Sequence, residues 1–200
     1  MRAEEQTSRH LLLAIIVTIF SGVLSLITVV MAWEVWMIAL MAAGCFSVWI
    51  LHIARLGADA VYENLCTGLL LIEFFYFGVH ETSLYEIPAV ACILILALFM
   101  LNKKWILHLT VALYVLELLY HAMILHTIPY PMELQAAVRL GLGAVMALGA
   151  VLLARYWINR RNEQRKWYER MFSDLETAGK QNAVFLSNVS HELRTPINMV

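Results

Sequence analysis

The stretch LLLAIIVTIFSGVLSLITVVM, residues 11–31, contains no charged side chain and is long enough to cross a lipid bilayer as a helix. A transmembrane helix needs about 20 mostly apolar residues to cross roughly 30 Å of hydrocarbon. Because this stretch is long and a second one follows at once, it is not a cleaved signal peptide. Similar stretches follow, so the sequence predicts six membrane spans, of which the fourth is the shortest: 11–31, 35–53, 61–78, 87–101, 105–125 and 136–157.

The composition of the whole chain agrees with several membrane spans. Of its 200 residues, 62% are hydrophobic and only 14% are charged, which lies well outside the usage of soluble globular domains. The three cysteines, Cys45, Cys66 and Cys92, lie within apolar stretches and lack the spacing of metal ligands. We therefore expect buried free thiols, and no disulfide framework can be inferred.

Basic residues predict which ends of the spans face the cytoplasm. They occur before the first span, between the second and third, between the fourth and fifth, and after the sixth, whereas the other loops contain no Lys or Arg before Arg139. Under the positive-inside rule, all four clusters fall on one side of a single topology. We expect a multi-pass protein of the inner or plasma membrane, surrounded by lipid, with both termini cytoplasmic and no nucleic-acid partner. The clusters contain Arg2, Arg9, Arg55, Lys103, Lys104, Arg160, Arg161, Arg165 and Lys166.

A charged segment, residues 158–181, follows the sixth predicted span and is expected to be helical. Along this segment and just beyond it, mostly apolar side chains recur at alternating steps of three and four, as at the a and d positions of a coiled coil. The pattern predicts a parallel coiled-coil linker between two copies of the chain. The alternative is a single amphipathic helix lying on the membrane surface. The seam consists of Tyr168, Met171, Leu175, Ala178, Asn182, Phe185 and Val189.

The run FLSNVSHELRTPINM, residues 185–199, combines a nucleophile with a neighbouring carboxylate. The imidazole of His191 has a lone pair available near neutral pH, and Glu192 can take its ring proton. This run resembles the H-box of bacterial sensor histidine kinases. The resemblance implies that His191 accepts the γ-phosphoryl group of ATP and that Glu192 is the general base. It also implies that Glu192 and Thr195 serve the reverse reaction, the dephosphorylation of the partner response regulator.

The resemblance also implies an architecture. We expect an all-α membrane protein with a six-span sensor domain at 1–157, the coiled-coil linker at 158–181, and the first helix of a dimerisation and histidine-phosphotransfer hairpin at 182–200. Such kinases are homodimers that use ATP and Mg²⁺ and pass the phosphoryl group to an aspartate of a response regulator receiver domain. The sequence contains neither the second helix nor a Gly-rich segment that could hold ATP. We therefore expect it to be part of a longer kinase and to be inactive by itself.

Ionisable residues inside the predicted spans are candidates for sensing a signal, because such groups are costly in hydrocarbon. Glu73 and Glu117 each lie twelve residues after the start of their spans, and His80 and His121 share their helical faces. We expect these four side chains to line a shared cavity in the outer half of the bundle. Alternatively, they only hold the helices together by hydrogen bonds. Ligand type also permits a metal site, although without a recognised spacing, from His80, Glu81, His121 and His126.

Two other classes of function stay open for this sequence. A small six-span transporter or channel would suit the polar faces of the spans, but the H-box and the linker count against it. A membrane receptor module without kinase activity is the second alternative. Substrate flux in vesicles would test the first alternative, and the sequence beyond residue 200 would test the second.

Overall fold

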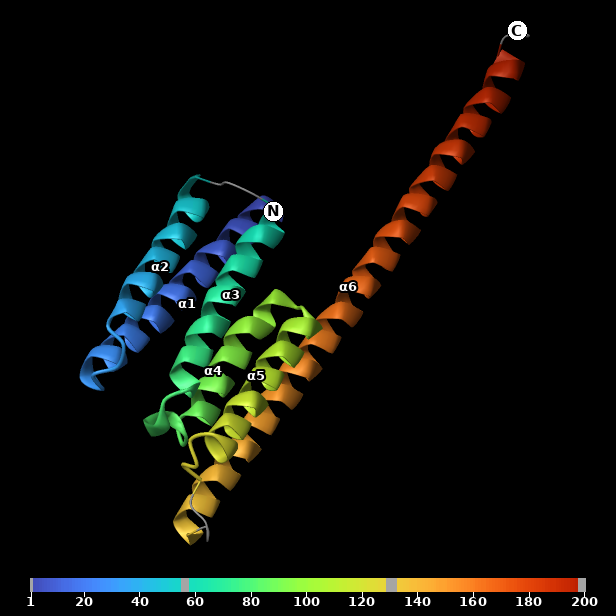
Figure 1. Cartoon of the computed structure of the whole chain (residues 1–200). Helices are drawn as coiled ribbons and strands as arrows, with labels where there is room; N and C mark the ends of the chain where they lie inside the picture. The colour runs from blue at the N-terminus through green and yellow to red at the C-terminus, as the bar shows by residue number, and fades with distance from the viewer. Residues whose placement is uncertain (1, 55–57, 129–132, 198–200) are drawn as a thin grey trace. The chain divides into compact units, whose positions relative to one another are not determined.

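The computed structural model describes residues 2–54, 58–128 and 133–197, except for the side chains of residues 2–7, 187, 188 and 190–197. All regular elements within these residues are helical (Figure 1). This result confirms the predicted all-helical class and the predicted number of six apolar helices. Arg55, one of the basic residues used to predict the topology, lies outside the described residues. The helices are α1 (Arg2–Val30), α2 (Trp36–Ala54), α3 (Asp59–Gly78), α4 (Ile87–Leu98), α5 (Lys104–Met123) and α6 (Leu134–Ile197), with short 3-10 helices η1 (Glu81–Ser83) and η2 (Phe99–Leu101).

The chain divides into two compact units. The bundle unit, Met1–Tyr156, contains α1 to α5 and the first part of α6. The C-terminal unit, Trp157–Val200, contains the rest of α6. The predicted sensor domain at 1–157 and linker at 158–181 stay predictions.

Five of the helices are long and apolar enough to cross a membrane, and Ile87–Leu101 is shorter. At the rise of an α-helix and a 3-10 helix, α4 and η2 together cover about 24 Å, less than the roughly 30 Å of a hydrocarbon core. The fourth element is therefore the short one, as the sequence predicts. Its first turn contains Pro88, whose missing N–H breaks no helical hydrogen bond at that position.

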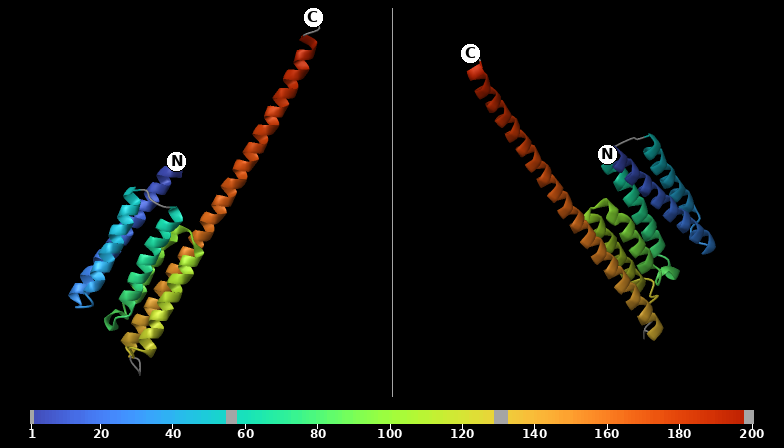
Figure 2. Two further views of the ribbon diagram at one scale, coloured as in Figure 1. Left: turned by 45° about the horizontal axis from the view of Figure 1, so that its top comes forward. Right: turned by 180° about the vertical axis from the view of Figure 1, so that it is seen from behind.

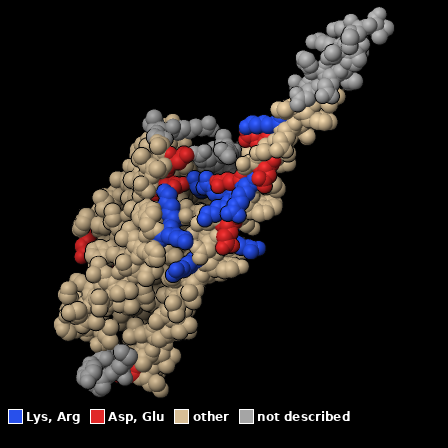
Figure 3. Space-filling model, turned by 90° about the vertical axis from the view of Figure 1, so that its right-hand side faces the viewer, with Lys and Arg blue, Asp and Glu red and all other residues tan. Residues whose placement is uncertain are grey.

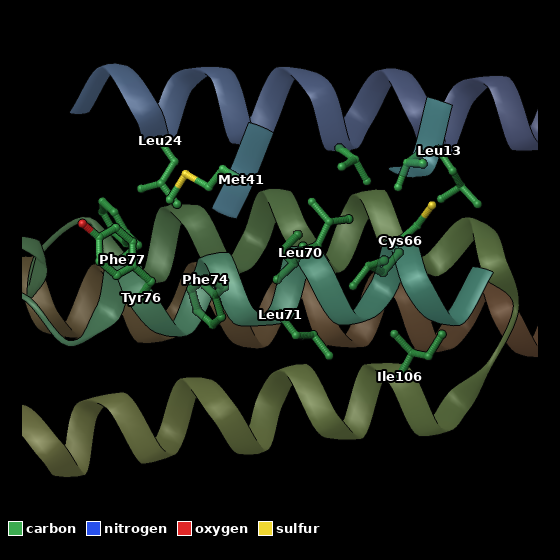
Figure 4. Packing of buried hydrophobic residues seen from close by; sticks show 14 of the residues in the cluster. Leu13, Leu24, Met41, Cys66, Leu70, Leu71, Phe74, Tyr76, Phe77 and Ile106 are labelled. Atoms are coloured by element: carbon green, nitrogen blue, oxygen red, sulfur yellow. The ribbon is translucent and has the colours of Figure 1, made fainter. Parts of the chain in front are cut away.

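Helix α3 is the centre of the bundle unit. It contacts α1, α2, α4 and α5. Of its most apolar stretch, 50% is buried, a larger share than in any other helix that is long and apolar enough to cross a membrane. Figure 2 shows α1 and α2 on one side of α3, and α4 and α5 on the other. In Figure 4, Leu13 and Leu24 of α1 and Ile106 of α5 point toward α3 from opposite sides.

Many large apolar side chains of the bundle unit face outward. Such a surface would be unfavourable in water, whereas hydrocarbon removes that cost. On the face drawn in Figure 3, a broad part of the surface carries no charged side chain. These features suit a protein surrounded by lipid. Side chains that are more than half exposed include Ile19 and Leu26 of α1, Phe46 of α2, Ile72 of α3 and Leu116 of α5.

Two local features bring helices of the bundle unit close together. Asn102 joins η2 to α5 with a φ of 55°, a left-handed conformation that asparagine adopts more readily than most residues. Gly143 of α6 lies against Pro88 of α4, and a Cβ at position 143 would be 2.6 Å from the Pro88 Cγ. The two helices can approach this closely only because residue 143 has no side chain.

Replacing Gly143 with valine should lower the free energy of unfolding by about 1–3 kcal/mol, because the added side chain overpacks the contact with Pro88. Denaturant titration of the purified chain in detergent would measure this loss. Gly141 provides a matched control on the same helix, since a Cβ there meets nothing within 4 Å. The same loss from Gly141→Val would show that the close approach of α4 and α6 is not the cause.

Candidate functional site

Four polar side chains on the face of α3 that contains Glu73 are buried. Tyr62, Cys66, Glu73 and Tyr76 of α3 are all less than 9% exposed. Since α3 packs against four other helices, these side chains meet protein rather than solvent. Their partners on neighbouring helices therefore decide what they can do.

Glu73 is hydrogen-bonded to α1. The Ser21 hydroxyl donates to Oε1 of Glu73 over 2.5 Å, and both side chains are buried. The other carboxyl oxygen of Glu73 has no hydrogen-bond partner among the described residues. This contact joins α1 to α3.

Glu117 lies against the end of α3. Its side chain is 1% exposed, and a Cβ at Gly78 would overlap its carboxyl group. Neither carboxyl oxygen of Glu117 has a hydrogen-bond partner among the described residues. One turn further along α5, His121 Nε2 lies 2.8 Å from the carbonyl oxygen of Gly78, and Nδ1 lies 2.7 Å from the hydroxyl oxygen of Thr127. These contacts join α3 to α5.

Glu73 and Glu117 do not lie at the same depth, which corrects the prediction from residue counts. Glu117 touches Gly78, which is five residues beyond Glu73 and therefore about 7.5 Å further along the helix axis. Counting from the start of each predicted span gives no information about how far α5 is shifted along α3. That shift is set by packing between the two helices.

His80 lies just past the end of α3 and contacts the connection between α1 and α2. Its ring stacks on Trp33, with centroids 3.6 Å apart and planes at 14°. Its Nε2 is 3.1 Å from Oε2 of Glu34, and its Nδ1 is 2.7 Å from the backbone carbonyl oxygen of Tyr76. The Tyr76 hydroxyl also donates to Oε2 of Glu34, over 3.4 Å. Trp33, Glu34, Tyr76 and His80 form what we call the His80 cluster.

The four predicted sensory residues thus have three separate sets of contacts. Glu73 joins α1, Glu117 and His121 meet the end of α3, and His80 meets the α1–α2 connection. The contacts do not bring the four together around one shared cavity. Nor are His80, Glu81, His121 and His126 assembled as metal ligands, since no group of three or more His, Cys, Asp or Glu side chains in the described residues is placed to hold a metal ion.

A buried ionic cluster near the start of α3 is the feature that the sequence analysis missed. Glu63 is 4% exposed, and each of its carboxylate oxygens faces one cation. Arg9 of α1 lies 2.7 Å from Oε1, and Lys103 of the α4–α5 connection lies 2.7 Å from Oε2. We call these three residues the Glu63 cluster. It ties three segments of the chain together at one point.

A signal for the Glu63 cluster was present in the sequence. Glu63 lies within the apolar span 61–78, where a carboxylate needs a partner, and Arg9 and Lys103 belong to basic clusters predicted for the same side of the membrane. Charged residues are common near the ends of membrane spans, so the charge of Glu63 alone does not indicate a buried cluster. Which cations reach Glu63 depends on how α1 and the α4–α5 connection pack beside α3.

The run that resembles an H-box begins in the last turns of α6. The backbone of His191, Glu192 and Thr195 is part of this helix, while their side chains, and residues 198 and 199 entirely, lie outside the described residues. In the C-terminal unit, the seam residues Tyr168 and Leu175 are 60% and 63% exposed. Phe172, beside the predicted seam, is 72% exposed. The apolar surface offered by this unit is therefore wider than the a and d positions alone.

Comparison of the chain with known protein families, with curated proteins and with solved structures gives no match. Functional inference therefore depends on the residues 185–199 and on the contacts within the bundle unit.

Replacing Glu63 with glutamine should lower the free energy of unfolding by about 3 kcal/mol, because Arg9 and Lys103 would lose the anion that compensates them. This value is at the low end for a buried ion pair, since the two cations are 39% and 28% exposed. Denaturant titration would measure the change. The control is Glu176→Gln, whose pair with Lys180 is exposed and should contribute less than about 1 kcal/mol. If Glu63→Gln unfolded at the same denaturant concentration as the parent protein, a stabilising role of the Glu63 cluster would be contradicted.

Proposed function

We propose that this chain is the membrane-embedded input region, linker and H-box of a homodimeric sensor histidine kinase. The observation that carries the proposal is the string SHELRTP at residues 190–196, with its lead-in from residue 185. It supplies an acceptor, a base and a polar hydroxyl in the order that the kinase family uses. The apolar helices of the bundle unit fit an input region in a membrane.

The chemistry assigned to the chain is phosphoryl transfer to His191. A ring nitrogen of His191 attacks the γ-phosphorus of ATP, the bond to ADP breaks, and Glu192 accepts the ring proton. The phosphoryl group then passes to an aspartate of a response regulator. Glu192 and Thr195 act in its later hydrolysis from that aspartate. We assign no residue of this chain to the binding of ATP or Mg²⁺.

The proposed topology places the Glu63 cluster on the cytoplasmic side and the His80 cluster on the outer side. The basic clusters before the first predicted span, between the fourth and fifth, and after the sixth support this orientation, because Lys and Arg are retained in cytoplasmic loops. It places His191 in the cytoplasm, where ATP is present. We propose an inner or plasma membrane location with both termini inside.

The proposed signal route starts at the polar contacts of α3 and α5 and ends at α6. Glu73, Glu117 and His121 are buried polar groups that join α3 to its neighbours. A change in their protonation or partners alters the attraction between those helices, and packed helices respond by small shifts. α6 extends as one helix from Leu134 to Ile197, so it includes both packed residues of the bundle unit and the H-box.

In the full-length kinase, His191→Gln should abolish incorporation of label from γ-labelled ATP and leave membrane insertion intact. The label on the parent protein should be acid-labile and base-stable, as a phosphoramidate is. His126→Gln is the control, because His126 is an exposed histidine outside the motif and its loss should leave labelling unchanged. Undiminished labelling of His191→Gln would contradict the assignment.

The linker should dimerise in parallel through the Tyr168–Val189 seam. In a background without Cys45, Cys66 and Cys92, cysteines introduced at Leu175 or Asn182 should crosslink between subunits faster than cysteines at Glu176 or Lys180. All four positions are exposed in the single chain, so a difference in rate reports the dimer axis rather than access to the oxidant. Gel electrophoresis without reducing agent gives the crosslinked fraction. Equal rates at the four positions would contradict the seam.

A further inference from the structure

Both ring nitrogens of His80 face hydrogen-bond acceptors. Nδ1 is 2.7 Å from the carbonyl oxygen of Tyr76, and Nε2 is 3.1 Å from a carboxylate oxygen of Glu34. A neutral imidazole has a single N–H and would satisfy only one of these acceptors. Its other nitrogen would then direct a lone pair at an oxygen. Only the doubly protonated imidazolium donates to both.

The surroundings of His80 also favour a positive charge. Its ring stacks on the indole of Trp33 at a centroid distance of 3.6 Å and meets the Tyr76 ring edge to face at 4.8 Å. Aromatic faces attract a cation at such distances. Hydrogen bonds from the backbone N–H of Glu34 itself and from His80 hold the pKa of the Glu34 carboxyl below its usual range. Glu34 therefore stays an anion while histidines titrate.

We propose that His80 is a proton-binding site that latches the α1–α2 connection to the end of α3. The ligand is a proton from the surrounding solution. It can reach the site, because the side chains of His80 and Glu34 are 14% and 55% exposed. The titratable groups in contact with His80 among the described residues are Glu34 and Tyr76, and Glu81 follows it on η1.

The direction of the pH effect follows from the charges. Histidine gains its charge as the pH falls through the range of about 8 to 5. At the acidic end the ring donates to both Glu34 and Tyr76, so the latch is closed and stabilises the native contacts. As the pH rises and the ring becomes neutral, one of the two hydrogen bonds is lost and the ion pair with Glu34 disappears. The stabilisation by the latch is therefore present at low pH and lost at high pH.

The role of this site in signalling rests on the proposed function, whereas proton binding by itself does not. In the proposed topology the latch faces the outside of the cell, so its state reports external acidity. The latch joins the segment after α1 to the segment after α3. Its opening would free the α1–α2 connection at the end of the bundle.

Trp33 offers a direct measurement, because a charged imidazole in contact with an indole quenches its fluorescence. In a chain where phenylalanine replaces the other tryptophans, Trp33 emission should fall as the pH is lowered from about 8 to about 5. This dependence should vanish in His80→Gln and move to lower pH in Glu34→Gln. Glu81→Gln, an exposed neighbour of His80, should titrate as the parent does. The proposal would be overturned if Trp33 emission did not change with pH, or if it changed in His80→Gln as it does in the parent. The tryptophans to replace are Trp36, Trp49, Trp105, Trp157 and Trp167.

A second measurement needs no change to the tryptophans. Diethyl pyrocarbonate acylates neutral imidazole and spares imidazolium, so peptide mass spectrometry after brief treatment gives the pH profile of each histidine. The His80 profile should move to lower pH in Glu34→Gln while that of His126 stays in place. An unmoved His80 profile would overturn the latch. Failure of the kinase assignment is read separately, as absent labelling of His191 in a protein whose Trp33 still titrates.

Discussion

The packed interior of the bundle unit offers no water to a carboxyl group, so the buried carboxyl groups of α3 take hydrogen-bond or charge partners from neighbouring segments. Helix α3 carries Glu63, Glu73 and Tyr76, all less than 9% exposed, and it lies between α1 and α2 on one side and α4 and α5 on the other (Figure 1). The central position of α3 meets this requirement, because a helix at the edge of the bundle would have neighbours on one side only. The most polar of the spans is therefore also the most buried.

At each end of α3 a carboxylate faces a basic side chain, but the basic groups differ. At Glu63, an arginine and a lysine face the two oxygens of one carboxylate, each at 2.7 Å. At His80, the partner of the carboxylate is an imidazole, which gains a second N–H when it binds a proton. The Glu63 end thus joins α1 and the α4–α5 connection to α3. At the other end, the strength of the contact between His80 and Glu34 depends on whether His80 has bound a proton.

Near the His80 end of α3, Glu117 is a carboxyl without a hydrogen-bond partner among the described residues, placed against Gly78 where any side chain would overlap it. A charged carboxylate in that position would be uncompensated, and such a charge is very costly in an apolar interior. The close fit of Gly78 and the hydrogen bond from His121 to its carbonyl oxygen link α5 to the same end of α3 that carries His80. Changes at the His80 cluster therefore occur beside the contact between α3 and α5.

Much of this protein was determined by local sequence. Apolar length alone predicts the six helices, and the shortness of residues 87–101 predicts the short α4, because crossing hydrocarbon requires a minimum helix length. The string around His191 identifies its candidate chemistry without any structure. Which buried polar groups meet was decided by tertiary packing: Ser21 with Glu73, Gly78 with Glu117, and Glu34 with His80. Residue counts give the position of a group along its own helix. The shift of one helix along another depends on how all the side chains between them pack, and no single residue determines it.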